Sequence, residues 1–149
     1  MGEDEAELLL AAGGGNTRIQ LLNVSLGKHE RTLTGHMDDI YDLKFHPQLK
    51  YLLLSASKDC SIRLWNIATY CQLAIYAGVD GHLGGVNCID WHRSGELFAS
   101  GGMDYCVKIW KITPEVSEHI KKSMSWTPEN KKFPVNVCLA VFSTNKVSG

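Results

Sequence analysis

The sequence SASKDCSIRLWNI at residues 55–67 returns as SGGMDYCVKIWKI at residues 100–112, an offset of 45 positions. A Gly-His pair precedes each copy, as Gly35-His36 and Gly81-His82. A repeat of about 40–45 residues with Gly-His near its start and a tryptophan at its end is typical of a β-propeller blade. Propellers bind partners on a rigid frame, so this period predicts a scaffold and not an enzyme.

Each copy divides into short strands separated by turn residues. The first copy predicts strands at 40–46, 52–57, 61–67 and 72–76, and the second at 86–92, 97–100 and 106–112. A weaker third copy lies upstream at residues 8–24, where Asn16 takes the place of Asp59 and Leu22 that of Trp65. The predicted fold class is all-β, a partial WD-repeat β-propeller of about two to three blades with a short helix in a C-terminal insertion.

The pattern changes after Ile112. Thr113 is a good N-cap and Pro114 suits the first helical position, so a short amphipathic helix is predicted to about Ser123. An extended stretch over 135–142 should follow it. We predict a disordered N-terminus at 1–6, a partial blade at 7–34, blades at 35–79 and 80–112, and at 113–149 an insertion with the helix, an outer strand and a frayed end.

Composition argues against several classes of partner. The net charge is −1 and no run of Lys or Arg exceeds two, so direct sequence-specific binding of nucleic acid is not expected. The longest apolar stretch, at 8–12, is far too short to span a bilayer, and the acidic start does not resemble a signal peptide. The five cysteines contain no C-x-x-C pair, which predicts reduced thiols. No cofactor, metal or membrane partner is expected.

One set of four residue types occurs twice. It consists of His36, Ser55, Asp59 and Trp65 in the first blade, and of His82, Ser100, Asp104 and Trp110 in the second. The predicted hydrogen bonds run from the Trp N–H to Ser, from Ser to His and from His to Asp. Ser, His and Asp also compose hydrolase triads, but an identical set beside a tryptophan in both copies favours a structural device.

Loops at one end of the blades are the candidate partner surface. They lie at 48–51, 68–71 and 94–96, together with the segment 113–134. The candidate contact residues are Gln48, Lys50, Thr69, Tyr70, Arg93, Lys121, Lys122 and Trp126. Trp126 has two interpretations, as a core residue under the blades or as part of the partner surface. His46 and His92 are interpreted as turn residues.

Several strings resemble one family of WD-repeat proteins. They are LKFHP at 43–47, AGVDGH at 77–82, the two repeat strings quoted above, and KKSMSWTPENKKFP at 121–134 followed by VFST at 141–144. Together they resemble the Extra sex combs / embryonic ectoderm development family of Polycomb-group proteins. The insertion at 121–134 is similar to its plant branch, fertilization-independent endosperm.

The resemblance implies a non-catalytic scaffold and reader subunit of a nuclear Polycomb repressive histone methyltransferase complex. Its members support histone lysine methylation and transcriptional repression. They hold a largely helical segment of the SET-domain methyltransferase subunit against the lower face of the propeller. They also bind a trimethylated histone lysine in an aromatic cage by cation–π attraction. The cage aromatics belong to other blades, so no residue here is assigned to it, and a histone tail is expected to bind only if those blades are supplied.

One alternative is a WD-repeat adaptor of another kind, such as a ubiquitin-ligase substrate receptor. The insertion at 113–134 separates the two, because a generic blade would pass directly into its outer strand. The family propeller has about seven blades. Since repeats need neighbours to bury their apolar faces, bare faces are expected near 8–24 and after the second full blade. The isolated chain should therefore be marginally stable, aggregation-prone or dependent on a partner.

Overall fold

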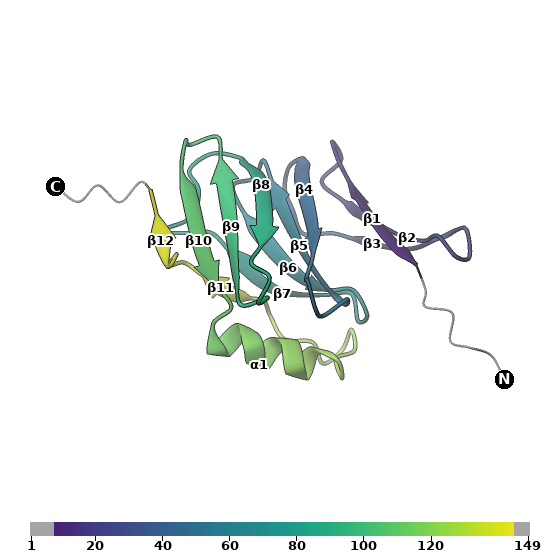
Figure 1. Cartoon of the computed structure of the whole chain (residues 1–149). Coiled ribbons are helices and arrows are strands. Elements are labelled where there is room, and N and C mark those ends of the chain that lie inside the picture. Colours follow the sequence, from purple (N-terminus) through teal and green to yellow (C-terminus); the bar gives the residue numbers. More distant parts are fainter. Residues whose placement is uncertain (1–7, 145–149) are drawn as a thin grey trace.

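The computed structural model describes residues 8–144 and forms three twisted sheets arranged side by side (Figure 1). The predicted disordered segment 1–6 and residues 145–149 of the predicted frayed end lie outside the described residues. Fraying is predicted to begin at Ser143, but Ser143 belongs to strand β12 (Phe142–Ser143) and the Thr144 N–H donates to the Val107 carbonyl. The order of sheets along the molecule follows the sequence, and helix α1 lies across one end of the second and third sheets (Figure 1). The predicted partial propeller is confirmed.

Each sheet is built on the same antiparallel meander of consecutive strands. The first contains β1 (Leu9–Gly13), β2 (Ile19–Asn23) and β3 (Lys28–Leu33). The second contains β4 (Ile40–Phe45), β5 (Leu52–Ser57), β6 (Ile62–Asn66), β7 (Cys71–Tyr76) and β11 (Val135–Val137), and the third contains β8 (Val86–Trp91), β9 (Leu97–Gly102), β10 (Val107–Lys111) and β12 (Phe142–Ser143). Among the described strands, the first sheet has no counterpart of the inner strands β4 and β8.

The same tight turn joins β1 to β2, β5 to β6 and β9 to β10. Its left-handed residue is Thr17, Cys60 or Tyr105, with φ of 64°, 72° and 63°. Each follows an Asn or Asp, whose short polar side chain bonds to nearby backbone N–H groups and so favours such turns. The weak upstream copy is therefore a true repeat at the level of backbone geometry.

Apolar side chains fill the two interfaces between sheets. Between the second and third sheets, the Tyr76 ring packs edge-on against Phe98 and Trp110, with centroids 4.8 and 5.6 Å apart. Between the first and second, Ile19 and Leu21 belong to one buried cluster with Trp65. Each of the two aromatic pairs of Tyr76 stabilises the fold by about 0.5–1.5 kcal/mol, in addition to the free energy gained by burying its apolar area.

The outer face of the third sheet is only partly covered by the described residues. Ile62 of β6 is fully buried against the third sheet, whereas its repeat equivalent Val107 in β10 is 47% exposed. Likewise Leu52 is 1% exposed, whereas its equivalent Leu97 is half-buried. The same position in the blade is thus a core residue in one sheet and a surface residue in the next.

Helix α1 (Pro114–Ser123) forms where the sequence predicts it, and that prediction is confirmed. The Thr113 hydroxyl accepts a hydrogen bond from the Val116 N–H, which satisfies one of the free N–H groups at the helix start. At the other end, the Asn66 amide donates to the Ser123 hydroxyl over 2.8 Å in a buried contact. The helix is therefore attached to the second sheet by a specific polar bond as well as by apolar packing.

The extended stretch predicted at 135–142 is two strands in two different sheets. β11 pairs in parallel with β7 at the edge of the second sheet, and β12 pairs antiparallel with β10 in the third. Between them the chain crosses from one sheet to the other, and the Cys138 carbonyl accepts the Asp80 N–H. The outer strand that the sequence predicts is present as β12, and the structure adds β11, because the segment first completes the edge of the preceding blade.

We expect Leu52→Ala and Leu97→Ala to lower the free energy of unfolding by different amounts, although the two residues occupy equivalent positions of the repeat. Loss of the fully buried Leu52 side chain should lower the free energy of unfolding by about 2–5 kcal/mol. Loss of Leu97 should cost less than about 1 kcal/mol, because part of that side chain already contacts water. Urea denaturation followed by tryptophan fluorescence measures both, and equal losses would contradict the unequal burial.

Candidate functional site

The first set of four residues forms a continuous buried chain of hydrogen bonds. The Trp65 indole N–H donates to the Ser55 hydroxyl over 2.9 Å, and that hydroxyl lies 2.6 Å from His36 Nε2. His36 Nδ1 lies 2.8 Å from an oxygen of Asp59. An ionised carboxylate only accepts, so Nδ1 carries the proton and Nε2 of the neutral ring accepts from Ser55. The loop before β4 is thereby attached to β5, to the β5–β6 turn and to β6.

The second set repeats this chain with nearly equal distances. The Trp110 indole N–H donates to Ser100 over 3.0 Å, and the Ser100 hydroxyl lies 2.7 Å from His82 Nε2. His82 Nδ1 lies 2.9 Å from Asp104. All bonds predicted from the sequence are present in both copies, in the predicted order.

The two carboxylates have different surroundings. Burial by itself would raise the pKa of Asp59, but hydrogen bonds from His36, from the Ser61 hydroxyl and from the Met37 N–H outweigh it, and the pKa lies well below 3.8. The pKa of Asp104 is also lowered against the effect of burial, by hydrogen bonds from His82 and two backbone N–H groups. Cys106 stands where the first copy has Ser61, so Asp104 has one hydroxyl donor fewer.

This geometry leaves the serines unable to act as nucleophiles. Ser55 is fully buried and Ser100 is 2% exposed. Each hydroxyl oxygen already accepts a tryptophan N–H, whereas a catalytic serine must reach its substrate beside an oxyanion site. Within residues 8–144, no group of three or more His, Cys, Asp or Glu side chains could hold a metal ion. In the same range, no helix has the length and apolar character needed to cross a membrane.

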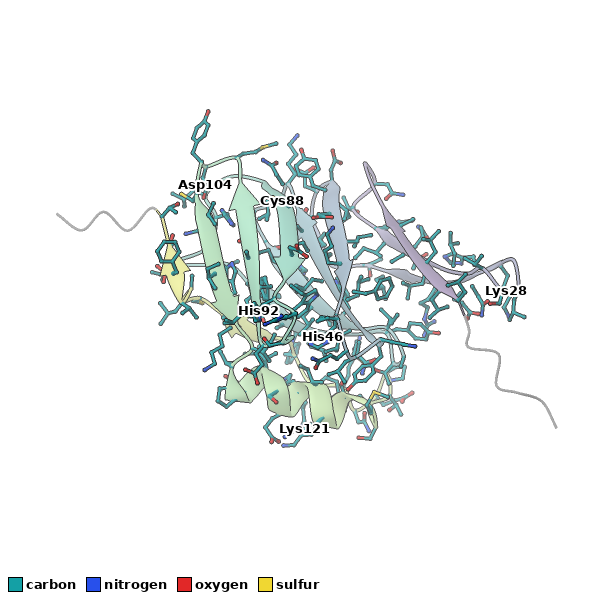
Figure 2. All side chains as sticks on the ribbon, viewed as in Figure 1. Lys28, His46, Cys88, His92, Asp104 and Lys121 are labelled. Atoms are coloured by element: carbon teal, nitrogen blue, oxygen red, sulfur yellow. The ribbon has the colours of Figure 1, made fainter. Side chains whose placement is uncertain are left out.

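The candidate partner residues gather at the end of the sheets where α1 lies, which we call the α1 end. His46, His92 and Lys121 are at this end, and Asp104 is at the opposite one (Figure 2). The exposed candidates are Gln48, Lys50, Arg93, Lys121 and Lys122, whereas Thr69 and Tyr70 are half-buried.

Trp126 does not belong to the exposed surface. It is 9% exposed, joins the core cluster under the second and third sheets, and packs edge-on against His119 at 5.2 Å. Of its two interpretations, the core residue describes it, because the turn after α1 folds the indole back beneath the sheets. It is therefore removed from the candidate contact residues.

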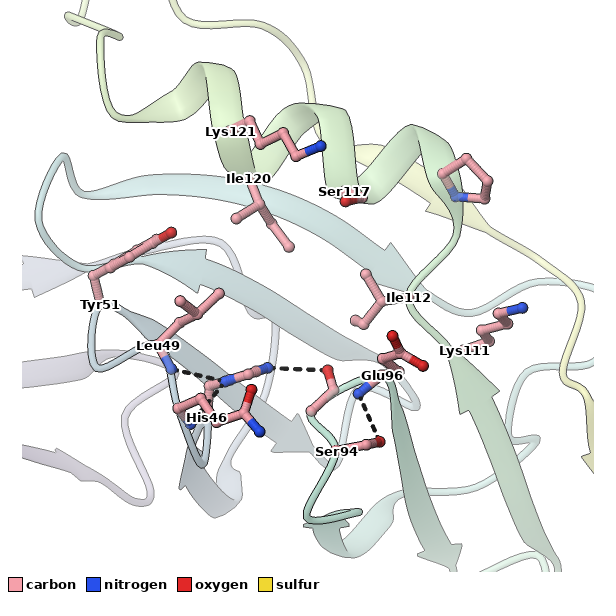
Figure 3. Close-up of a pocket in the computed structure, with 13 residues that line it drawn as sticks. His46, Leu49, Tyr51, Ser94, Glu96, Lys111, Ile112, Ser117, Ile120 and Lys121 are labelled. Atoms are coloured by element: carbon pink, nitrogen blue, oxygen red, sulfur yellow. Dashed lines mark hydrogen bonds between the residues drawn. The ribbon is translucent and has the colours of Figure 1, made fainter.

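Two grooves flank α1 at this end, and Tyr51 lines both. The first, of about 530 Å³, lies between α1 and the turns that hold His46 and Ser94 (Figure 3). Its apolar wall is formed by Leu49, Tyr51, Ile112 and Ile120, and its polar rim includes Gln48, Glu96, Lys111 and Lys121. The second, of about 470 Å³, runs from Tyr51 to the first sheet and is lined by Leu9, Leu21, Ile67, Tyr70 and Met124, with Glu30 and Lys50 as charged residues.

His46 has a larger role than the turn residue that the sequence suggests. Its Nδ1 accepts the N–H groups of Gln48 and Leu49, so its Nε2 carries the proton and donates to the Gly95 carbonyl over 2.9 Å (Figure 3). Gly95 has φ +73°, and a Cβ there would collide with the His46 ring. This contact joins the turns of two neighbouring blades. It could not be predicted from the sequence, because the pattern of residues within one repeat does not indicate contacts with the next repeat.

We expect Ser55→Ala and Ser100→Ala each to destabilise the chain. Either change leaves a buried indole N–H and an imidazole nitrogen unpaired, which should cost about 1–3 kcal/mol. Ser125, which is exposed, is the control, and Ser125→Ala should change stability by less than about 0.5 kcal/mol. Urea denaturation measures all three, and a stability loss confined to one of the two buried serines would contradict a repeated structural role.

Acid should weaken the fold through Asp59. Because its pKa is lower in the folded chain, Asp59 stabilises the fold above pH 4, and this stabilisation is lost as the pH falls below the unfolded value of 3.8. The loss should be on the order of 1–2 kcal/mol. Asp59→Asn should be less stable at pH 7 and should lose less between pH 7 and pH 3, whereas the exposed Asp90→Asn should follow the unaltered chain. Identical pH dependence of unfolding in Asp59→Asn and the unaltered chain would contradict this assignment.

Comparison with known proteins places the repeats in a family. The model of the WD domain, G-beta repeat, matches residues 27–66 and 73–111. The chain is 41% identical over 132 residues to Polycomb group protein FIE1 of Zea mays, and 40% identical over 127 residues to Polycomb protein esc of Drosophila melanogaster. These matches cover 88% and 85% of the chain but 28% and 30% of the relatives, so the chain spans less than a third of their length.

Solved structures agree with these relatives. A chain in the crystal structure of the Chaetomium thermophilum polycomb repressive complex 2 is similar with a TM-score of 0.79 and 25% identity, over 97% of this chain and 28% of that one. A chain in the apo, autoinhibited form of that complex gives 0.76 and 27%, over 91% and 27%. The chain belongs to the WD-repeat family and, within it, to the Polycomb-group proteins of the Extra sex combs and fertilization-independent endosperm type.

Proposed function

We propose that the chain acts in the nucleus as part of a non-catalytic scaffold subunit of a Polycomb repressive histone methyltransferase complex. In this proposal the α1 end holds a helical segment of the SET-domain methyltransferase subunit, which supports histone lysine methylation and transcriptional repression. The observation that carries it is the pair of grooves that flank α1 and share Tyr51.

The lining of the grooves suits an amphipathic helix. Such a helix places apolar residues at intervals of three and four along one face and buries them in an apolar groove. Leu49, Tyr51 and Ile120 offer apolar side chains in the first groove, and Ile67 and Met124 continue this surface in the second. The exposed cations and amides at the rim could meet the polar flanks of the bound helix.

The insertion favours this partner over that of a generic WD-repeat adaptor. Ile120 of α1 lines the first groove, and Met124, the C-cap of α1, lines the second. Each groove therefore includes a residue of the segment that a generic blade would lack. A substrate receptor of a ubiquitin ligase remains the alternative, and it would not need α1. Histone-tail binding is proposed only for a propeller that contains further blades, since no aromatic residue here is assigned to a cage.

The proposal predicts that Leu49→Asp and Met124→Asp weaken binding to the methyltransferase subunit. Leu49 is 37% exposed and Met124 is 50% exposed, so neither charge should prevent folding. A carboxylate in the apolar wall must lose water when a helix covers it, which should reduce binding at least tenfold. The test is retention of the co-expressed methyltransferase subunit on the tagged full chain.

The matched control lies at the opposite end of the blades. Leu83 is 82% exposed beside the Gly-His loop, and Leu83→Asp should bind as well as the unaltered chain. Circular dichroism establishes that all three variants retain their fold. Failure of the unaltered chain to retain the methyltransferase subunit, or equal weakening by Leu83→Asp, would overturn the proposal without affecting family membership.

A further inference from the structure

A third cavity, which shares Tyr70 with the second groove, has the lining of an anion site. It measures about 360 Å³ and lies between β3, the β6–β7 turn and the loop after α1, and we call it the rim cavity. Two cationic residues, Arg31 and Lys131, line it, and no acidic residue does. Within residues 8–144, neither cation has a carboxylate within 4.0 Å. Glu30, next to Arg31, contacts Asn23 and lines the second groove instead.

Arg31 is held in position by an aromatic ring. Its guanidinium carbon lies 4.4 Å from the centroid of the Tyr70 ring, a cation–π contact that leaves its N–H groups free to donate at the edge. Tyr70 has φ of 60°, a left-handed conformation that a bulky residue rarely adopts. The equivalent turn of the first sheet has Gly27, with φ of 66°. The second sheet therefore has a tyrosine at the position where the first sheet has a glycine. The ring of this tyrosine supports Arg31.

Neutral donors complete the lining. Gln72 Oε1 accepts a hydrogen bond from Arg63 over 2.8 Å, so its amide NH₂ is left to donate. The Thr69 hydroxyl is buried and has no partner among the described residues. Lys131 is held by a turn in which its N–H donates to the Thr127 carbonyl over 3.0 Å. The cavity therefore offers positive charge and N–H donors.

We propose that the rim cavity binds an anionic oxygen group, a phosphate or a carboxylate, on a side chain of a partner polypeptide. Arg31 and Gln72 donate hydrogen bonds to its oxygens, and Lys131 adds charge from the facing loop. The site shares Tyr70 with the second groove, but Arg31, Gln72 and Lys131 line neither groove. It would add an acidic or phosphorylated anchor to any polypeptide that follows the outer edge of the first two sheets.

The test is a titration of the full ¹⁵N-labelled chain with inorganic phosphate and, separately, with acetate, at constant ionic strength. Saturable shifts of the Gln72 side-chain amide and the Thr69 backbone amide are expected at millimolar concentrations. Saturation by phosphate alone identifies a phosphate site, and saturation by acetate identifies a carboxylate site. Linear, unsaturated shifts with both ions would overturn the proposal.

Three variants distinguish a specific anion site from nonspecific attraction of anions to surface cations. Lys131→Glu should weaken binding at least fivefold, whereas Lys132→Glu, an exposed neighbour that does not line the cavity, should not. Tyr70→Gly removes the ring beneath Arg31 but suits the backbone of the turn, so it should retain the fold and also weaken binding at least fivefold. Equal weakening by Lys132→Glu, or full binding by Tyr70→Gly, would overturn the proposal.

Discussion

The buried bond between His36 and the Asp59 carboxylate is the constraint on which the first complete blade depends. A buried carboxylate is tolerated only when hydrogen bonds replace its water, and here they come from a loop, a turn and a neighbouring hydroxyl. Removing any one member leaves the others unpaired, so the loop, the turn and the two middle strands keep one relative geometry. The same device in the next blade holds its own loop, turn and strands in one relative geometry.

Because this end of each blade is fixed, the α1 end is free to vary. The turn after β4, the turn after β6 and the whole segment after β10 differ in length and chemistry between repeats, yet each starts from a strand whose position is already set. The grooves and the rim cavity are built from those variable segments. Rigid repeats thus supply the frame, and the parts that break the repeat supply the surface for recognition.

The repeat explains which features could be predicted from the sequence. Trp65, Ser55 and Asp59 recur at fixed offsets and have complementary donors and acceptors, so their bonds follow from one blade alone. The helix can also be predicted from the sequence, because Thr113 and Pro114 mark its start. His46 and Gly95 could not be paired, because their contact joins two repeats. The parallel pairing of β11 was also hidden, since a three-residue strand has too little pattern to indicate its neighbour.

The position of β11 has a consequence for the order in which the molecule can be completed during synthesis. Ala74 in β7 pairs with Val135, about sixty positions later in the chain. At roughly 5–20 residues per second, a ribosome needs several seconds to deliver that partner. Throughout this interval β7 is an unpaired edge, which can add a strand from another nascent chain. The second sheet thus gains its outer edge only after β8, β9 and β10 of the third sheet have been translated.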